Sequence, residues 1–202
     1  MLKQKDIMDC LPLLASVLGN QYGVTVEIGG SEAYTNGKTI HLPALPLDSE
    51  PELITMIKGY CDHESAHIRE TDFEILRKAN LTPFQHNLFN ILEDWRVEER
   101  LSARYPGCRE NFRYLIQKLF GTQKAGDTNP AFSILNAILL TVRSWSVDAI
   151  IPRRESVAKT MERHYPGLRK ALDGILDRVK DSCKDTGDCI RYALELEQAT
   201  LA

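Results

Sequence analysis

The sequence has no long apolar run, no marked excess of charge of one sign and few aromatic residues. No stretch approaches the roughly 18 apolar residues that a membrane-spanning helix needs. The N-terminal segment, MLKQKD, is too polar for a secretory signal. Lys and Arg total 25 against 28 Asp and Glu, so a net charge of -3 gives no electrostatic reason to expect nucleic acid or an anionic membrane. We therefore expect a cytoplasmic protein that binds neither.

Cysteine is also scarce. The chain has five cysteines among 202 residues, which is an odd number in a chain long enough to build an apolar core. This usage favours reduced thiols over a disulfide framework. Cys183 and Cys189 lie near each other in the sequence, but their spacing is not that of a zinc knuckle, and we predict two unpaired loop thiols.

The N-terminal part of the chain predicts one helix and a small sheet. Apolar residues recur at helical spacing over residues 4–18, and Gly19-Asn20 is a helix end signal. Alternating apolar residues over 24–28 predict a strand. Residues 34–42 contain an Asn36-Gly37 turn between two extended runs, which predicts a hairpin. We expect a small antiparallel sheet in which residues 39–42 form an edge that can pair with an extended peptide.

The rest of the sequence reads as helix. A helix is expected over about 50–67, and Thr82-Pro83-Phe84-Gln85 matches a capping box that begins a second helix running to residue 105. Further helices are expected near residues 108–120, 130–145, 153–164, 166–180 and 188–200. The fold class is therefore α+β, predominantly helical, in a single domain over residues 1–202. Its sheet and first long helix occupy about 20–70, and its helical body occupies about 82–202.

One motif carries chemistry: His63-Glu64-Ser65-Ala66-His67, an H-E-x-x-H sequence inside a predicted helix. Histidines four residues apart project from one helical face, so both imidazoles can bind one Zn²⁺. Glu64, about 100° around the helix, can then reach a metal-bound water as general base. The pattern predicts a zinc-dependent metallopeptidase, a hydrolase that acts on a peptide or protein substrate.

A catalytic zinc of this kind needs a third protein ligand. The next long helix offers Glu93, Asp94 and Glu98. At 100° per residue, Asp94 lies about 100° from the centre of that helix's apolar side and Glu93 about 160°. Asp94 also shares a polar stripe with Glu98 beside the apolar face, where a ligand and its hydrogen-bonding partners would sit. The longer Glu93 remains an alternative ligand.

Four segments together resemble the N-terminal region of CobT-like proteins, which are relatives of a cobaltochelatase subunit found in bacteria and phages. The segments are Ile40-His-Leu-Pro43, His63-Glu-Ser-Ala-His67, Phe89-Asn-Ile-Leu-Glu-Asp-Trp-Arg-Val-Glu98 and Arg104-Tyr-Pro-Gly107, within about residues 23–120. The H-E-x-x-H part is shared by many zincins, and the stretch from 89 to 98 is more selective. The resemblance implies a zincin-like, metallopeptidase-like helical domain that precedes a von Willebrand factor A domain.

The resemblance also bears on the third ligand. In related predicted metallopeptidases an Asn followed four residues later by Asp occupies the third-ligand helix, which matches Asn90 and Asp94 here. Zincins with a glutamate ligand would point to Glu93 instead. The chain departs from the family pattern in having no D-x-S-x-S signature of a von Willebrand factor A domain. We expect either a truncated or a stand-alone version.

Two functions follow from these observations. The main one is a zinc metallopeptidase with His63, His67 and Asp94 as ligands and Glu64 as general base. The alternative, implied by the chelatase resemblance, is a non-catalytic metal-binding module that acts with an AAA+ ATPase or von Willebrand factor A-type partner. Oxyanion stabilisation in the peptidase would fall to a hydrogen-bond donor, for which the sequence offers His86, Arg96, Tyr105 and Tyr114.

Overall fold

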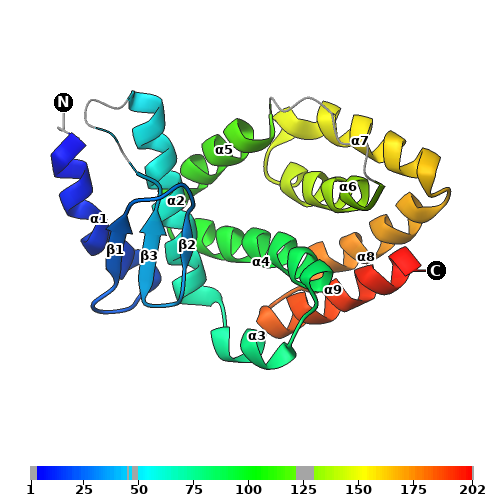
Figure 1. Cartoon of the computed structure of the whole chain (residues 1–202), viewed down its shortest axis with the longest axis horizontal. Helices are drawn as coiled ribbons and strands as arrows, with labels where there is room; N and C mark the ends of the chain where they lie inside the picture. The colour runs from blue at the N-terminus through cyan, green and yellow to red at the C-terminus, as the bar shows by residue number, and fades with distance from the viewer. Residues whose placement is uncertain (1–3, 45, 47–49, 122–129, 202) are drawn as a thin grey trace. The chain divides into compact units, whose positions relative to one another are not determined.

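The computed structural model describes residues 4–44, 46, 50–121 and 130–201, and its elements there are mostly helices (Figure 1). The helices are α1 (Gln4–Gly19), α2 (Pro51–Glu70), α3 (Phe73–Ala79), α4 (Pro83–Arg104), α5 (Pro106–Phe120), α6 (Pro130–Ser144), η1 (Asp148–Ile150), α7 (Ile151–His164), α8 (Leu168–Ser182) and α9 (Thr186–Leu201). The strands are β1 (Thr25–Ile28), β2 (Tyr34–Thr35) and β3 (Thr39–Leu42). The predicted α+β class, predominantly helical with a small sheet, is confirmed.

The sheet is mixed, so the prediction of an antiparallel sheet is wrong for β1. Strand order is β1-β3-β2, with β3 antiparallel to β2 and parallel to β1. The predicted turn between β2 and β3 is present: Gly37 has φ 91°, and the amides of Lys38 and Thr39 donate to Asn36 Oδ1. Strands β1 and β2 are not neighbours in the sheet, because β3 lies between them. Strand β3 is therefore central and is not the edge that we expected.

The chain divides into two compact units. Unit 1 comprises Met1–Thr71 and Val97–Leu115, and unit 2 comprises Asp72–Arg96 and Ile116–Ala202. The residues of α4 and α5 are shared between the units, and each of these helices is nevertheless uninterrupted. The expectation of one domain across residues 1–202 stays a prediction.

Unit 1 is built by packing α1 and α2 against the sheet, as Figure 1 shows. Ile40 and Leu42 of β3 alternate with the more exposed Thr39 and His41, so one face of the sheet is buried. The apolar side chains buried there are Leu11, Ala15, Val24, Ile40, Leu42, Ile57 and Cys61. A second cluster joins α2 to α4 and α5 through Leu18, Ala66, Val97, Leu101, Cys108 and Phe112. Together these clusters fix α2.

Unit 2 has its own apolar core, to which the first half of α4 and helices α6 to α9 contribute. Trp95 and Trp145 meet edge to face at 4.8 Å between ring centroids. The predicted capping box that starts α4 is present, because the Gln85 amide donates to Thr82 Oγ1 and the Thr82 amide donates to Gln85 Oε1. The first half of α4 is thereby held in this unit.

Sequence periodicity misses the short helix α3. It has seven residues, none of them buried, so it shows no apolar stripe. Its start is fixed by Asp72, whose side chain accepts from the amides of Glu74 and Ile75.

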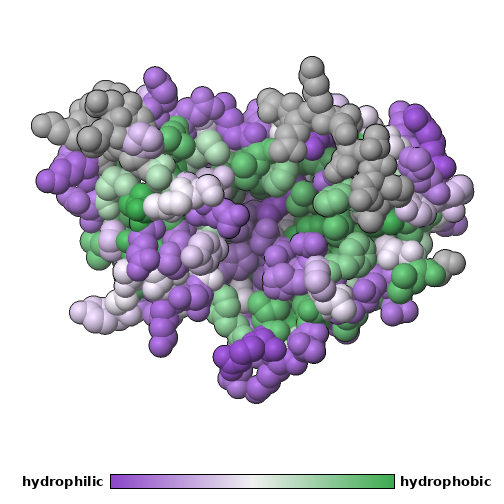
Figure 2. All heavy atoms as spheres, in the orientation of Figure 1, coloured by the Kyte–Doolittle hydropathy of each residue, from purple (hydrophilic) through white to green (hydrophobic). Residues whose placement is uncertain are grey.

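Polar and apolar side chains alternate over the face of the molecule in Figure 2. Within the described residues, no helix combines the length and apolarity needed to cross a membrane.

Candidate metal centre

Helix α2 presents His63 and His67 one turn apart on the same face. Their rings meet edge to face with centroids 4.8 Å apart. The helix begins with Pro51 at its first turn, and Ile57 and Cys61 anchor it in the core of unit 1. Both imidazoles are only partly exposed.

Glu98 holds the first histidine. Nδ1 of His63 lies 2.8 Å from Oε1 of Glu98, and the side chains are only 14% and 8% exposed. A carboxylate on Nδ1 orients the ring and fixes the tautomer, so a metal would be coordinated through Nε2. The contact has the form of the carboxylate–histidine pairs that surround zinc in proteins.

Thr71 holds the second histidine in the same way. Nδ1 of His67 lies 3.0 Å from Oγ1 of Thr71. Thr71 is the residue that ends α2, and its amide donates to the His67 carbonyl at 2.9 Å, so its position is set by the helix end. Both histidines therefore have Nδ1 within hydrogen-bond distance of an oxygen.

Asp94 is the carboxylate predicted as the third ligand. His63, His67 and Asp94 are donor types that could together hold one metal ion. Asp94 and Glu98 are one turn apart on the continuous helix α4. Arg143 of α6 binds Asp94 through an Nη2 to Oδ2 contact of 2.7 Å. A carboxylate can serve both a cation and a metal, because its two oxygens provide about four lone-pair sites.

Glu93, the alternative third ligand, is engaged elsewhere. It is 0% exposed and accepts from Nε and Nη2 of Arg96 at 2.9 and 2.6 Å. The hydroxyl of Thr186 also donates to it at 2.9 Å. Burial by itself lowers the pKa of Arg96, but the bonds and the charge of Glu93 outweigh burial and raise this pKa overall. Glu93 is thus engaged by Arg96 and Thr186, whereas Asp94 pairs with Arg143. The choice between them as third ligand stays a prediction.

The remaining predicted site residues have varied surroundings. Glu64 is buried in α2 at 5% exposure. Among the four residues considered for oxyanion stabilisation, Arg96 pairs with Glu93, the Tyr105 hydroxyl accepts from Arg69 at 3.2 Å, and His86 is exposed. Tyr114 is partly exposed on α5.

Two residues around the metal group could not be found from the motif. Thr71 lies four residues after His67, so helical spacing is the sequence signal that places its hydroxyl near that ring. Arg143 is 49 residues from Asp94, and nothing local in the sequence links them.

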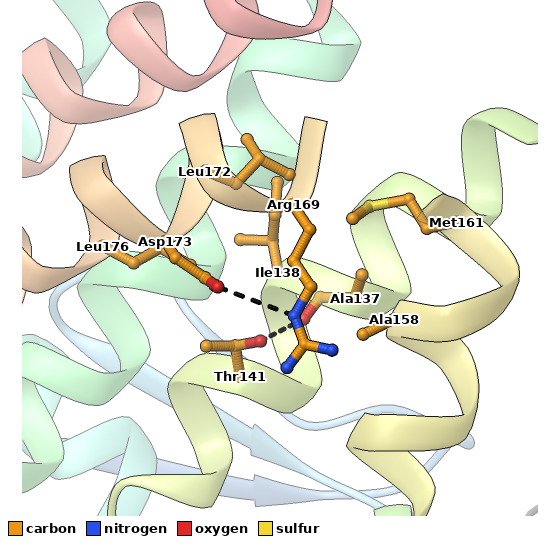
Figure 3. Close-up of a pocket in the computed structure, with 9 residues that line it drawn as sticks. All are labelled: Ala137, Ile138, Thr141, Ala158, Met161, Arg169, Leu172, Asp173 and Leu176. Carbon is orange, nitrogen blue, oxygen red and sulfur yellow. Dashed lines mark hydrogen bonds and ion pairs between the residues drawn. The ribbon is translucent and has the colours of Figure 1, made fainter. Parts of the chain in front are cut away.

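A separate small pocket lies in unit 2 among α6, α7 and α8 (Figure 3). Most of its lining side chains are apolar: Ala137, Ile138, Ala158, Met161, Leu172 and Leu176. Its charged residues, Arg169 and Asp173, face each other with a 3.6 Å contact, and Arg169 also pairs with Glu155 at 3.1 Å. Because Arg169 is paired with acidic residues of the protein, we do not assign this pocket as a binding site for a charged ligand.

The chain was compared with protein families, curated proteins and solved structures. Residues 3–196 match the family described as cobalamin biosynthesis protein CobT. The chain belongs to the CobT family. No curated protein and no solved structure matches significantly. The resemblance found from four segments is thus confirmed at the level of the family, and it covers almost the whole chain.

The metallopeptidase prediction is wrong. The matching family is one of cobalamin biosynthesis and not of peptidases, so the chain is not assigned as a hydrolase, a zincin or an H-E-x-x-H enzyme. The physical reason is that two imidazoles at helical spacing and a nearby carboxylate are the donors of catalytic and structural metal sites alike. The motif identifies a way to bind metal, and it does not specify a reaction.

Proposed function

We propose that this CobT family protein is a non-catalytic metal-binding module of a chelatase-type assembly. The observation that carries the proposal is the support of both histidines: Glu98 and Thr71 engage the two Nδ1 atoms, as outer-shell partners of metal ligands do. A solvated histidine pair on a helix surface would have no need of such partners.

His63, His67 and Asp94 would hold the ion. Two neutral imidazoles and one carboxylate suit a borderline divalent cation, and Zn²⁺ is our choice because it favours nitrogen and oxygen donors in tetrahedral sites. When bound, such an ion would offset the negative charge of Asp94 and Glu98. The proposed role is structural, so Glu64 has no catalytic part in it.

The partner in this proposal is another chelatase subunit, of the AAA+ ATPase or von Willebrand factor A type. Membership of the CobT family supports this partner, because a protein of cobalamin biosynthesis would take part in inserting cobalt, a reaction that a chelatase carries out. The site itself would accept Co²⁺ as well as Zn²⁺, because geometry, ligand type and metal availability, more than raw affinity, select among divalent metals.

Metal titration of the full chain tests the proposed site. We expect about one Zn²⁺ per chain by elemental analysis and by calorimetry after chelation and reloading. His63→Ala should weaken binding by more than the roughly 10- to 100-fold that loss of an outer-shell partner costs. His164→Ala is the matched control, because His164 is exposed at the end of α7. Wild-type protein that binds no zinc at micromolar levels, or equal loss in both variants, would refute the site.

A partner assay tests the role. The wild-type chain and Glu64→Gln should bind an AAA+ chelatase subunit equally in a co-purification experiment, and both should retain zinc. His63→Ala should lose zinc. Because the proposed role of the ion is to hold the structure that the partner binds, this variant should also lose partner binding. Retained partner binding by zinc-free His63→Ala would separate the metal site from the assembly and contradict the proposal.

A further inference from the structure

Two thiols of unit 2 lie next to each other at the junction of α8 and α9. Sγ of Cys183 is 3.2 Å from Sγ of Cys189. Cys183 directly follows α8, and Cys189 lies in the first turn of α9. The prediction of two unpaired loop thiols is therefore wrong in the loop position of Cys189, while both thiols are unpaired as predicted. Both cysteines are reduced in the structure.

The separation favours a disulfide over a metal site. A disulfide bond is about 2.05 Å long, so the two sulfurs need to approach by little more than about 1 Å. Two thiolates on a tetrahedral zinc, each about 2.3 Å from the ion, would stand roughly 3.8 Å apart. The group of potential metal ligands found in the described residues contains neither cysteine.

The turn between the helices holds the two thiols in place. The amide of Cys183 donates to the Val179 carbonyl at 3.0 Å and closes α8. The Lys184 amide donates to Asp188 Oδ2, and the Asp188 amide donates to Asp185 Oδ1, each at 2.9 Å. These bonds fix both ends of the segment, so the sulfurs meet without a search through many loop conformations.

The two thiols differ in access. Cys189 is 0% exposed, whereas Cys183 is partly exposed. The hydrogen bond to Cys183, burial and the negative charge of Glu93 raise the pKa of the Cys189 thiol. Cys183 is thus the thiol that an oxidant in solution can reach, and the buried Cys189 is the resolving thiol.

We propose that Cys183 and Cys189 form a reversible redox pair that a hydroperoxide converts to a disulfide. The Cys183 thiolate attacks one oxygen of hydrogen peroxide, the O–O bond breaks, and the leaving hydroxide takes up a proton to become water. The resulting sulfenic sulfur is attacked by Cys189, the S–O bond breaks, and the departing hydroxide takes the Cys189 proton. In sum, two thiols and one peroxide give one disulfide and two waters.

The disulfide would lock the segment that supports the buried ion pair of unit 2. Thr186, between the two cysteines, donates to Glu93 and accepts from the amide of Asp72 at 2.9 Å. Fixing the turn at both ends removes freedom from the unfolded chain and holds this hydroxyl in place. Oxidation therefore stabilises the α8–α9 junction.

Peptide mapping of the full chain tests the pair directly. The reduced protein is treated with hydrogen peroxide, remaining thiols are alkylated, and trypsin is added. Cleavage after Lys184 separates Cys183, in peptide 181–184, from Cys189, in peptide 185–191. We expect the two peptides to be linked after oxidation, with a loss of two hydrogen atoms, and to separate again with dithiothreitol.

Variants make the assignment specific. Cys10→Ser is the matched control, because Cys10 is exposed on α1, and it should form the same linked peptides. Cys183→Ser should leave Cys189 reduced and alkylated only after unfolding. Peptides that stay separate in the wild type, or over-oxidation of Cys183 without linkage, would overturn the proposal. So would a fall in Tm on oxidation, because it would show that the native turn does not accommodate the bond.

Discussion

Oε1 of Glu98 lies 2.8 Å from Nδ1 of His63, so the first histidine of the motif is oriented by a carboxylate from α4. Each residue is at least 85% shielded from solvent, and water competes poorly for the contact. The metal-binding proposal depends on this relationship, because an imidazole held by Nδ1 has lost the rotational freedom that binding would otherwise cost.

Removing this contact should weaken the metal site. We expect Glu98→Ala to lower zinc affinity about 10- to 100-fold, which is the usual cost of losing an outer-shell partner. Glu99→Ala on the same helix is the control, since Glu99 is partly exposed and its ion pair with Arg109, at 3.6 Å, is a surface one. Competition titration with a zinc chelator measures both. Equal affinities of the two variants would show that Glu98 does not support the ligand.

The neighbouring acids Glu93 and Asp94 should give opposite results. Asp94→Asn should lose zinc affinity with a smaller loss of stability, because the Asp94 side chain is 25% exposed. Glu93→Gln should keep zinc affinity and lose about 3–5 kcal/mol of unfolding free energy, because Arg96 is left as a buried charge with a weaker partner. Calorimetry and urea unfolding distinguish these results. A zinc-deficient but stable Glu93→Gln would reverse the ligand assignment.

The buried carboxyl of Asp62 should make stability depend on pH. Burial raises the pKa of Asp62 from its ordinary 3.8, although the hydrogen bond from Asn111 opposes the shift. The folded state therefore binds this proton more tightly than the unfolded state. The stabilisation from this proton is fully present below pH 3.8 and is lost as pH rises through the folded pKa.

Asp62→Asn removes that titration and serves as the comparison. The unfolding free energy of the wild type, minus that of the variant, should fall as pH rises above about 4. Urea unfolding across a pH series measures the difference. A difference that stays constant, or that grows with pH, would contradict a raised pKa.

Gly59 permits a close approach of α2 and α5. A Cβ at this position would lie 3.2 Å from the Asn111 carbonyl oxygen and 3.3 Å from Leu115 Cβ. A Cβ added at Gly174 on α8 would have no heavy atom within 4 Å. Gly174→Ala should therefore stabilise the protein by about 0.5–1 kcal/mol through helix propensity. Gly59→Ala should lose that gain and destabilise the protein by about 1–3 kcal/mol. Thermal unfolding of the two variants gives the comparison.

The sequence determined most of the local structure of this protein. Apolar spacing predicts α1, α2 and the later helices, and the Thr82 and Gln85 side chains set the start of α4 as predicted. Helical spacing also places His63 and His67 on one face. Each of these features depends on residues within about one helical turn of one another, which a single sequence displays directly.

Tertiary structure decided the relationships between distant segments. It placed β3 between β1 and β2, it paired Arg143 with Asp94 across 49 positions, and it paired Thr186 with Glu93 across 93 positions. Alternation along a strand shows which face is buried but not which strand lies beside it. Helical phase likewise ranks two neighbouring carboxylates, but the packing of side chains from other helices decides which partner each one contacts.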